Sequence, residues 1–177
     1  MLYRVNAGRV PKEHWVQDLD VGGGRVVGEM CHFVDYMQAL CRSSPVSVFA
    51  ARIGKHTSGI IDDQCTISLT FGDGSIGTIV YTAEGNNGLP KEFFEAHADG
   101  KSLTMDHFME TRLYDGTRKQ LFKTGKREKG FSEEMARFVG AIEQGLPPVI
   151  PFAQIEAVTR ACLLAVQSLR SGSAYHL

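Results

Sequence analysis

The sequence predicts an α+β fold: an open, mixed and mostly antiparallel sheet with helices packed on one face. A run of short strand patterns joined by tight, glycine-containing turns fills the middle of the chain, as in an antiparallel meander. Helical periodicity is confined to the segments on either side of that run. Because no linker, repeat or low-complexity tract interrupts the 177 residues, we expect one domain over residues 1–177, without a Rossmann domain.

The first third is expected to contain a strand, an irregular connection and a helix. Residues 2–6 are the strand, and because the chain starts directly in it, we expect a further segment before it. The only tryptophan, Trp15, lies in the connection, and Gly22-Gly23-Gly24 then breaks regular structure. A helix over about 25–42 follows, because apolar residues recur at three- and four-residue steps. Its predicted buried stripe consists of Val27, Met30, Cys31, Val34, Met37 and Cys41, widened by Phe33 and Leu40.

The middle third alternates apolar and polar residues with the period of half-buried strands. After the first clear strand, Gly72-Asp73-Gly74-Ser75 supplies a hairpin turn. An extended segment over 46–50 comes before it. The predicted strands are 65–71, 76–83, 92–98, 102–106, 108–114 and 119–123.

Two helices are expected at the end of the chain. The first spans about 132–144, with Ser132 as its N-cap and Gly145 beyond its C-terminus. Its predicted buried stripe is Met135, Phe138, Val139 and Ile142. The second spans about 153–171 and stops at Gly172. Its predicted buried residues are Ile155, Val158, Cys162, Val166 and Leu169.

The charge balance argues against binding to nucleic acid or to an anionic membrane. Lys and Arg total 19 against 20 Asp and Glu, which gives a formal net charge of -1. One basic cluster is interrupted by Glu128 and lacks interleaved aromatic residues, so we interpret it as a solvated loop. It comprises Lys119, Lys123, Lys126, Arg127 and Lys129. No apolar run reaches the roughly 20 residues that a membrane-spanning helix needs.

The N-terminus and the cysteines predict a cytoplasmic protein. Residues 1–10 contain two arginines and no long apolar run, so they do not form a signal peptide. None of the four cysteines belongs to a Cys-x-x-Cys pair. Cys31 and Cys41 would lie about 15 Å apart on one helix, too far for a disulfide. Isolated thiols of this kind suit a reducing compartment.

Motifs for nucleotides and metals are weak or missing. Gly22-Gly23-Gly24 comes before a helix, but no apolar strand leads into it, so a phosphate site there is the less favoured interpretation. Gly54-Lys55-His56-Thr57 lacks the upstream glycine and the helix of a P-loop. No metal is expected either, because no zinc-type spacing joins the candidate ligands His32, His56, Asp62, Asp63, His97 and His107.

Glu29 and His32 are the candidate catalytic residues. They lie three residues apart, which places both on one flank of the predicted helix, with His32 well away from the apolar stripe. A histidine near neutral pH suits general acid or base work, and a neighbouring carboxylate would orient it. Tyr36 follows on the same flank. The alternative is an ordinary surface pair that contributes a few tenths of a kcal/mol, about 0.2–0.5.

Several strings together resemble the C-terminal domain of the Gfo/Idh/MocA oxidoreductases. The most specific is the glycine run followed by Gly28-Glu29-x-Cys31-His32-Phe33-x-Asp35. Supporting strings are Arg4-x-Asn6-Ala7-Gly8, His14-Trp15, the Asp73-Gly74-Ser75 hairpin, Lys91-Glu92 and the closing segment from Gly145 to Ile150-Pro151-Phe152. The resemblance covers nearly the whole chain.

The resemblance implies a function that this chain shares with a second domain. Members of the family pair an N-terminal Rossmann domain with this α+β domain, bind NAD or NADP between the two, and act on a sugar, inositol or related polyol. His32 matches the catalytic acid/base, while Gly28 stands where many members have an aspartate, so Glu29 is expected to substitute for it. The family's lysine belongs to the Rossmann half. The resemblance also implies substrate contacts by Arg4, Asn6, His14, Trp15 and Arg25.

Three functions therefore remain open. The favoured one is the substrate-binding and oligomerisation half of an NAD(P)-dependent oxidoreductase, with the isolated chain inactive. The others are a non-catalytic binding or scaffold module and a cofactor-independent sugar lyase or isomerase using His32 and Glu29. We also expect a homodimer or tetramer, because helices on one side leave the other sheet face to be covered. That face would carry Cys65, Ile67 and Leu69 or their polar neighbours.

Overall fold

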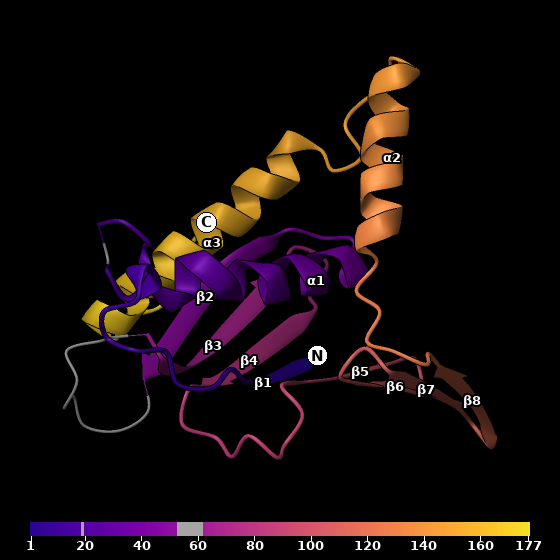
Figure 1. Ribbon diagram of the computed structural model, residues 1–177, viewed down its shortest axis with the longest axis horizontal. Helices are drawn as coiled ribbons and strands as arrows, with labels where there is room; N and C mark the ends of the chain where they lie inside the picture. The colour runs from indigo at the N-terminus through magenta and orange to yellow at the C-terminus, as the bar shows by residue number, and fades with distance from the viewer. Residues whose placement is uncertain (19, 53–61) are drawn as a thin grey trace.

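A computed structural model describes residues 1–18, 20–52 and 62–177 of the chain. The segment Gly54-Lys55-His56-Thr57 considered above lies outside them. The described residues form a sheet with the strand order β8-β7-β6-β5-β1-β4-β3-β2-β9 (Figure 1). Its strands are β1 (Leu2–Asn6), β2 (Pro45–Arg52), β3 (Gln64–Phe71), β4 (Ile76–Thr82), β5 (Glu92–Ala98), β6 (Lys101–Asp106), β7 (Glu110–Asp115), β8 (Arg118–Lys123) and β9 (Tyr175–His176).

The strand pairing confirms the predicted sheet. β1 pairs with β4 in parallel, and the other neighbouring strands pair antiparallel. Every predicted strand is present, with bounds that differ by a residue or two. The largest shift in the start of a strand is at β7, which begins at Glu110 because His107 and Phe108 both have positive φ, 51° and 56°, and make the turn from β6. The sequence did not indicate the two-residue strand β9.

Helices cover one face of the sheet. The chain has a 3₁₀ turn η1 (Trp15–Gln17), a π-helical turn η2 (Val26–Met30) and the helices α1 (Cys31–Cys41), α2 (Phe131–Glu143) and α3 (Phe152–Ser171). α1 and α3 lie on the same side of β2, β3 and β4, while β6 to β8 extend beyond them (Figure 1). The α+β fold, with its helices packed on one face, is therefore as predicted for α1 and α3.

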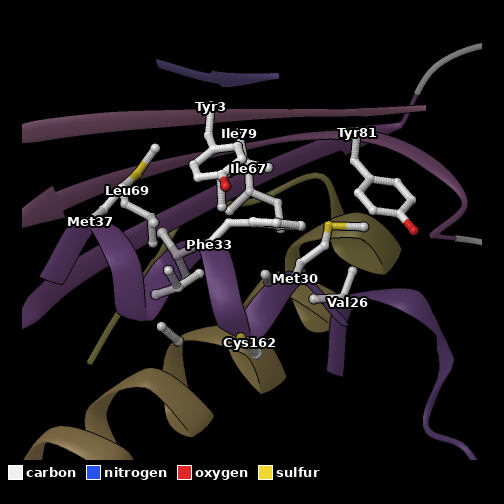
Figure 2. Close-up of a cluster of buried hydrophobic side chains, with 14 of the residues drawn as sticks. Tyr3, Val26, Met30, Phe33, Met37, Ile67, Leu69, Ile79, Tyr81 and Cys162 are labelled. Atoms are coloured by element: carbon white, nitrogen blue, oxygen red, sulfur yellow. The ribbon is translucent and has the colours of Figure 1, made fainter. Parts of the chain in front are cut away.

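The core lies between the sheet and α1. Tyr3, Ile67 and Ile79 of the strands meet Met30, Phe33 and Met37 of the helix (Figure 2), all at most 4% exposed. The rings of Tyr3 and Phe33 are 4.6 Å apart. Cys65, Ile67 and Leu69 thus face the helices, and the uncovered face carries their polar neighbours, which are Thr66, Ser68 and Thr70.

The buried side of the first helix differs from the predicted stripe. Val26 and Gln38 are buried, whereas Val27, Cys31 and Cys41 are only partly covered and Leu40 is 46% exposed. The helix starts with the π turn η2, which has more residues per turn than an α-helix. That turn shifts the phase of the side chains at the start of the helix, where Val26 is buried in place of Val27. The middle of the stripe is buried as predicted, at Met30, Phe33, Val34 and Met37.

The predicted burial of α2 is wrong. Its apolar stripe, from Met135 to Ile142, is 45–66% exposed, and the helix stands away from the sheet (Figure 1). Ser132 is not the N-cap, because Gly130, with φ 80°, comes before the first helical residue. In α3, Ile155 is also 48% exposed, and burial begins at Val158. Periodicity identifies an apolar face, but it does not identify what that face meets.

No described helix combines the length and the apolar character that a membrane crossing requires.

Candidate functional site

The carboxylate of Glu29 joins the start of the first helix to two strands. Lys91, immediately before β5, places its Nζ 2.5 Å from Glu29 Oε1. Arg25 Nη2 lies 3.0 Å from Oε2, and the Tyr81 hydroxyl of β4 donates to that same oxygen. Arg25 Nε in turn donates to the Tyr81 oxygen at 2.5 Å. We call Arg25, Glu29, Tyr81 and Lys91 the Glu29 cluster.

The Glu29 cluster has a fixed charge state at neutral pH. Burial raises the pKa of Glu29, but hydrogen bonds from Lys91 and Tyr81 and the charges of Lys91 and Arg25 outweigh it, so the net pKa is lowered. Burial and the hydrogen bond to Glu29 raise the pKa of Tyr81, which keeps its phenol protonated as a donor. One carboxylate faces two cationic side chains, so the Glu29 cluster carries an excess of positive charge.

His32 lies outside this network. Its side chain is exposed, one turn along the helix from Glu29. The expected Glu29–His32 pair is not formed, because the Glu29 oxygens bind Lys91, Arg25 and Tyr81. The carboxyl group that responds to His32 is Asp35: burial raises the Asp35 pKa, and the charge of His32 acts in the opposite direction. His32 is thus free to meet a ligand.

Arg4 and Asn6, predicted as substrate contacts, hold the loop that leads to Lys91. Arg4 Nη1 donates to the Pro90 carbonyl at 2.6 Å. Asn6 Nδ2 donates to the carbonyls of Asn86 and Leu89 at 2.8 and 3.1 Å. These contacts place the end of β1 against the loop, so both residues position Lys91, and Asn6 also lines a pocket beside it.

His14 and Trp15 lie in the turn that packs on the start of the helix. His14 Nδ1 accepts from the Val16 amide at 3.3 Å and caps η1, and Trp15 is 61% exposed. A Cβ at Gly22 would come within 2.5 Å of the Trp15 carbonyl oxygen, so only glycine allows this approach. A Cβ at Gly28 would lie 3.4 Å from Val16. The turn therefore borders the helix flank that carries Glu29 and His32.

The glycine run does not fit a nucleotide pyrophosphate. Such a group normally binds the free amides of a helix that follows a strand. Here the amide of Val26 donates to the buried carboxylate of Asp62 at 2.8 Å, so an anion already occupies the helix start. The run follows a 3₁₀ turn and not a strand. The glycine run is therefore not a pyrophosphate site for NAD or NADP.

The candidate metal ligands do not assemble. Within 1–18, 20–52 and 62–177, no group of three or more His, Cys, Asp or Glu side chains is placed to hold a metal ion. Asp62 serves as the cap described above. His97 is bonded to Ser102 at 2.8 Å on the hairpin of β5 and β6. His56 lies outside the described residues.

The sequence reasoning missed Tyr81, Lys91 and the Glu92–Lys129 pair. Glu92 is 1% exposed, accepts from the Tyr3 hydroxyl at 2.7 Å and lies 2.7 Å from Lys129 Nζ. Lys129 also lies over the ring of Phe108, while it remains exposed like the rest of the basic cluster. The sequence feature that could have indicated these residues is the charged pair Lys91-Glu92 at the start of a half-buried strand, because buried charged residues are usually paired.

Comparisons with known proteins give a family model and solved structures. The model described as GFO/IDH/MocA C-terminal domain matches residues 2–103. No curated protein matches the chain. Aldose-aldose oxidoreductase from Caulobacter crescentus, complexed with glycerol, is 15% identical with a TM-score of 0.79, over 99% of this chain and 55% of that one.

Two further structures have the same fold. Levoglucosan dehydrogenase, in complex with NADH and levoglucosan, is 17% identical with a TM-score of 0.78, over 99% of this chain and 57% of that one. UDP-N-acetylglucosamine 3-dehydrogenase from Acidithiobacillus ferrooxidans is 18% identical with a TM-score of 0.74, over 94% and 52%. The chain spans about half the length of these structures, which at such identities establish the fold alone.

Proposed function

This chain belongs to the Gfo/Idh/MocA family, whose C-terminal domain it contains, and we propose that it is the substrate-binding half of an NAD(P)-dependent oxidoreductase acting on a sugar or polyol. The observation that carries the proposal is the exposed His32 beside a carboxylate already held by Lys91, Arg25 and Tyr81. The imidazole of His32 is therefore the acid/base group of this helix flank that can reach a substrate, and it lies next to the charged Glu29 cluster.

His32 is the proposed acid/base. Oxidation of an alcohol needs a base for the hydroxyl proton, and the reverse reaction needs an acid. An imidazole near neutral pH performs both, and its exposure lets a substrate hydroxyl reach it. Glu29 does not orient His32 directly. Its part is to hold Lys91 and Arg25 in place, so that their positive charge favours a substrate oxygen that loses its proton.

The nucleotide belongs elsewhere in this proposal. The glycine run does not fit a pyrophosphate, so a nicotinamide nucleotide would be bound by another domain placed over the same helix flank. The chain's own residues bind the sugar, present its hydroxyl to His32 and move the proton. The similar structures of an aldose-aldose oxidoreductase with glycerol and of levoglucosan dehydrogenase with NADH and levoglucosan support this choice of substrate class.

A binding experiment on the chain tests the proposal. Neutral sugars and polyols are titrated while the ring signals of the histidines are followed by NMR. We expect at least one ligand to shift the His32 signals and to leave His97, on the β5–β6 hairpin, unchanged. If no sugar or polyol at high millimolar concentration moves the His32 signals, the proposed substrate class is wrong.

A further inference from the structure

A small polar pocket lies beside the Glu29 cluster and has no part in the proton transfer described above. Its volume is about 270 Å³. That is below the roughly 300 Å³ at which pockets begin to hold whole ligands, so it suits one substituent of a sugar. Its lining includes Asn6, Gly8, Asn87, Leu89, Lys91 and His107.

The charges around this pocket are positive. Lys91 lines it and reaches Glu29 with its ammonium group. Glu29 is shared with Arg25, so one carboxylate does not neutralise both cations. None of the residues that line the pocket is an aspartate or a glutamate. An anionic group entering the pocket would therefore meet uncompensated positive charge and no acidic side chain.

One buried polar atom of the lining residues lacks a partner and can carry a proton for an anion. Among the described residues, His107 Nδ1 has no hydrogen-bond partner. Asn6 Oδ1 is also unpaired, but it is an acceptor that lies against Gly85, so it offers an anion no hydrogen bond. Leaving a buried polar atom unpaired is costly, and such groups are commonly satisfied by a ligand or water.

We propose that this pocket binds the anionic group, a carboxylate or a phosphate, of an acidic sugar whose hydroxyl lies at His32. The inference rests on the proposed function and names its substrate class. Lys91 connects the two places, since it lines the pocket and bonds Glu29, which neighbours His32 on the helix flank.

The test compares matched ligands on the intact chain. Glucose, glucuronate, glucose 6-phosphate and inorganic phosphate are titrated by NMR at low salt. We expect glucuronate or glucose 6-phosphate to bind about tenfold tighter than glucose, the scale of one charge-assisted hydrogen bond. That advantage should shrink as salt is raised. The preferred anion identifies whether the pocket takes a carboxylate or a phosphate.

Variants of the lining residues test whether the pocket causes the preference for acidic sugars over glucose. Lys91→Gln should remove the tenfold advantage, and His107→Gln, which leaves the Lys91–Glu29 bond intact, should reduce it. The control is Lys101→Gln, which removes the same charge from the exposed Lys101–Asp115 pair and should retain the preference. Melting transitions of all variants establish that each is folded.

Four outcomes overturn the inference. Equal affinity for glucose and the acidic sugars contradicts it while His32 shifts still support the proposed function. A preference that survives both Lys91→Gln and His107→Gln places the anion elsewhere. Inorganic phosphate binding as tightly as the sugar phosphate means an adventitious ion only. If no ligand shifts His32 at all, the proposed function fails as well.

Discussion

Glu29 and His32 occupy one helix flank, yet their surroundings give them different chemistry. Glu29 is three-quarters or more covered and bound by three partners, so it is poorly suited to accept a proton from a substrate. His32 is exposed and one turn away. The spacing of the two residues indicated the flank, but only the positions of Tyr81 and Lys91, 52 and 62 residues further along the chain, show which residue remains free.

His32→Asn should separate a catalytic from a structural role. Because the side chain is exposed, we expect the free energy of unfolding to change by less than about 0.5 kcal/mol. In the enzyme assembled with a nucleotide-binding domain, turnover should fall by about 10²-fold or more, as for loss of an acid/base group. His97→Asn, another partly solvated histidine, should leave turnover intact. A large loss of stability with unchanged turnover per folded molecule would show that His32 is structural.

Glu29→Gln should change how stability depends on pH. The folded-state pKa of Glu29 is lowered, so its carboxylate stabilises the fold above its unfolded pKa of about 4.3, and this contribution is lost as pH falls through the lower folded value. The difference in unfolding free energy between wild type and Glu29→Gln should therefore be largest at neutral pH and shrink in acid. Urea unfolding across this range measures it.

The control for this experiment is Glu84→Gln, which removes one partner of the exposed Arg9–Glu84 pair. Exposed pairs contribute little, so its effect should stay below about 1 kcal/mol and vary weakly with pH. A Glu29→Gln effect that is equally small, or constant down to about pH 3, would contradict the assigned role of the Glu29 cluster.

At the scale of elements, local patterns predicted the strands well and the helix faces poorly. Alternation and glycine turns are local signals, so β3 to β8 were found within a residue or two. A π turn adds residues without a sequence signal, so the buried position at the helix start is Val26 and not Val27, while the middle of the stripe is as predicted. One face of α2 is apolar as predicted, but an apolar face does not show which surface the helix packs against. Local sequence patterns could not predict the Glu29 cluster, because its residues are distant from one another in the sequence.

The exposed face of α2 gives a stability prediction. Phe138→Ser and Ile142→Ser, at 57% and 66% exposure, should change the free energy of unfolding by less than about 0.5 kcal/mol. Leu169→Ala on α3, at 5% exposure, should cost about 2–5 kcal/mol. Urea denaturation of the three variants makes the comparison. Losses of several kcal/mol from the α2 variants would show that α2 packs against the rest of the chain.

At the scale of the whole molecule, one face of the sheet is left without helices. We propose that a second copy of the chain covers it, through the side that carries Thr66, Ser68 and Thr70. A stable interface of this kind buries upward of about 2,000 Å². Light scattering should therefore report a dimer or larger, and Ser68→Arg should weaken it whereas Ser132→Arg on α2 should not. A clean monomer at high micromolar concentration would reject the proposal.

The central claim is that this chain supplies the substrate half of an oxidoreductase and leaves the nucleotide to another domain. Titration calorimetry with NADH and NADPH on the isolated chain tests it most directly. Because Asp62 already caps the helix start that follows the glycine run, we expect affinities no tighter than about millimolar. A low-micromolar dissociation constant for either nucleotide would contradict the claim.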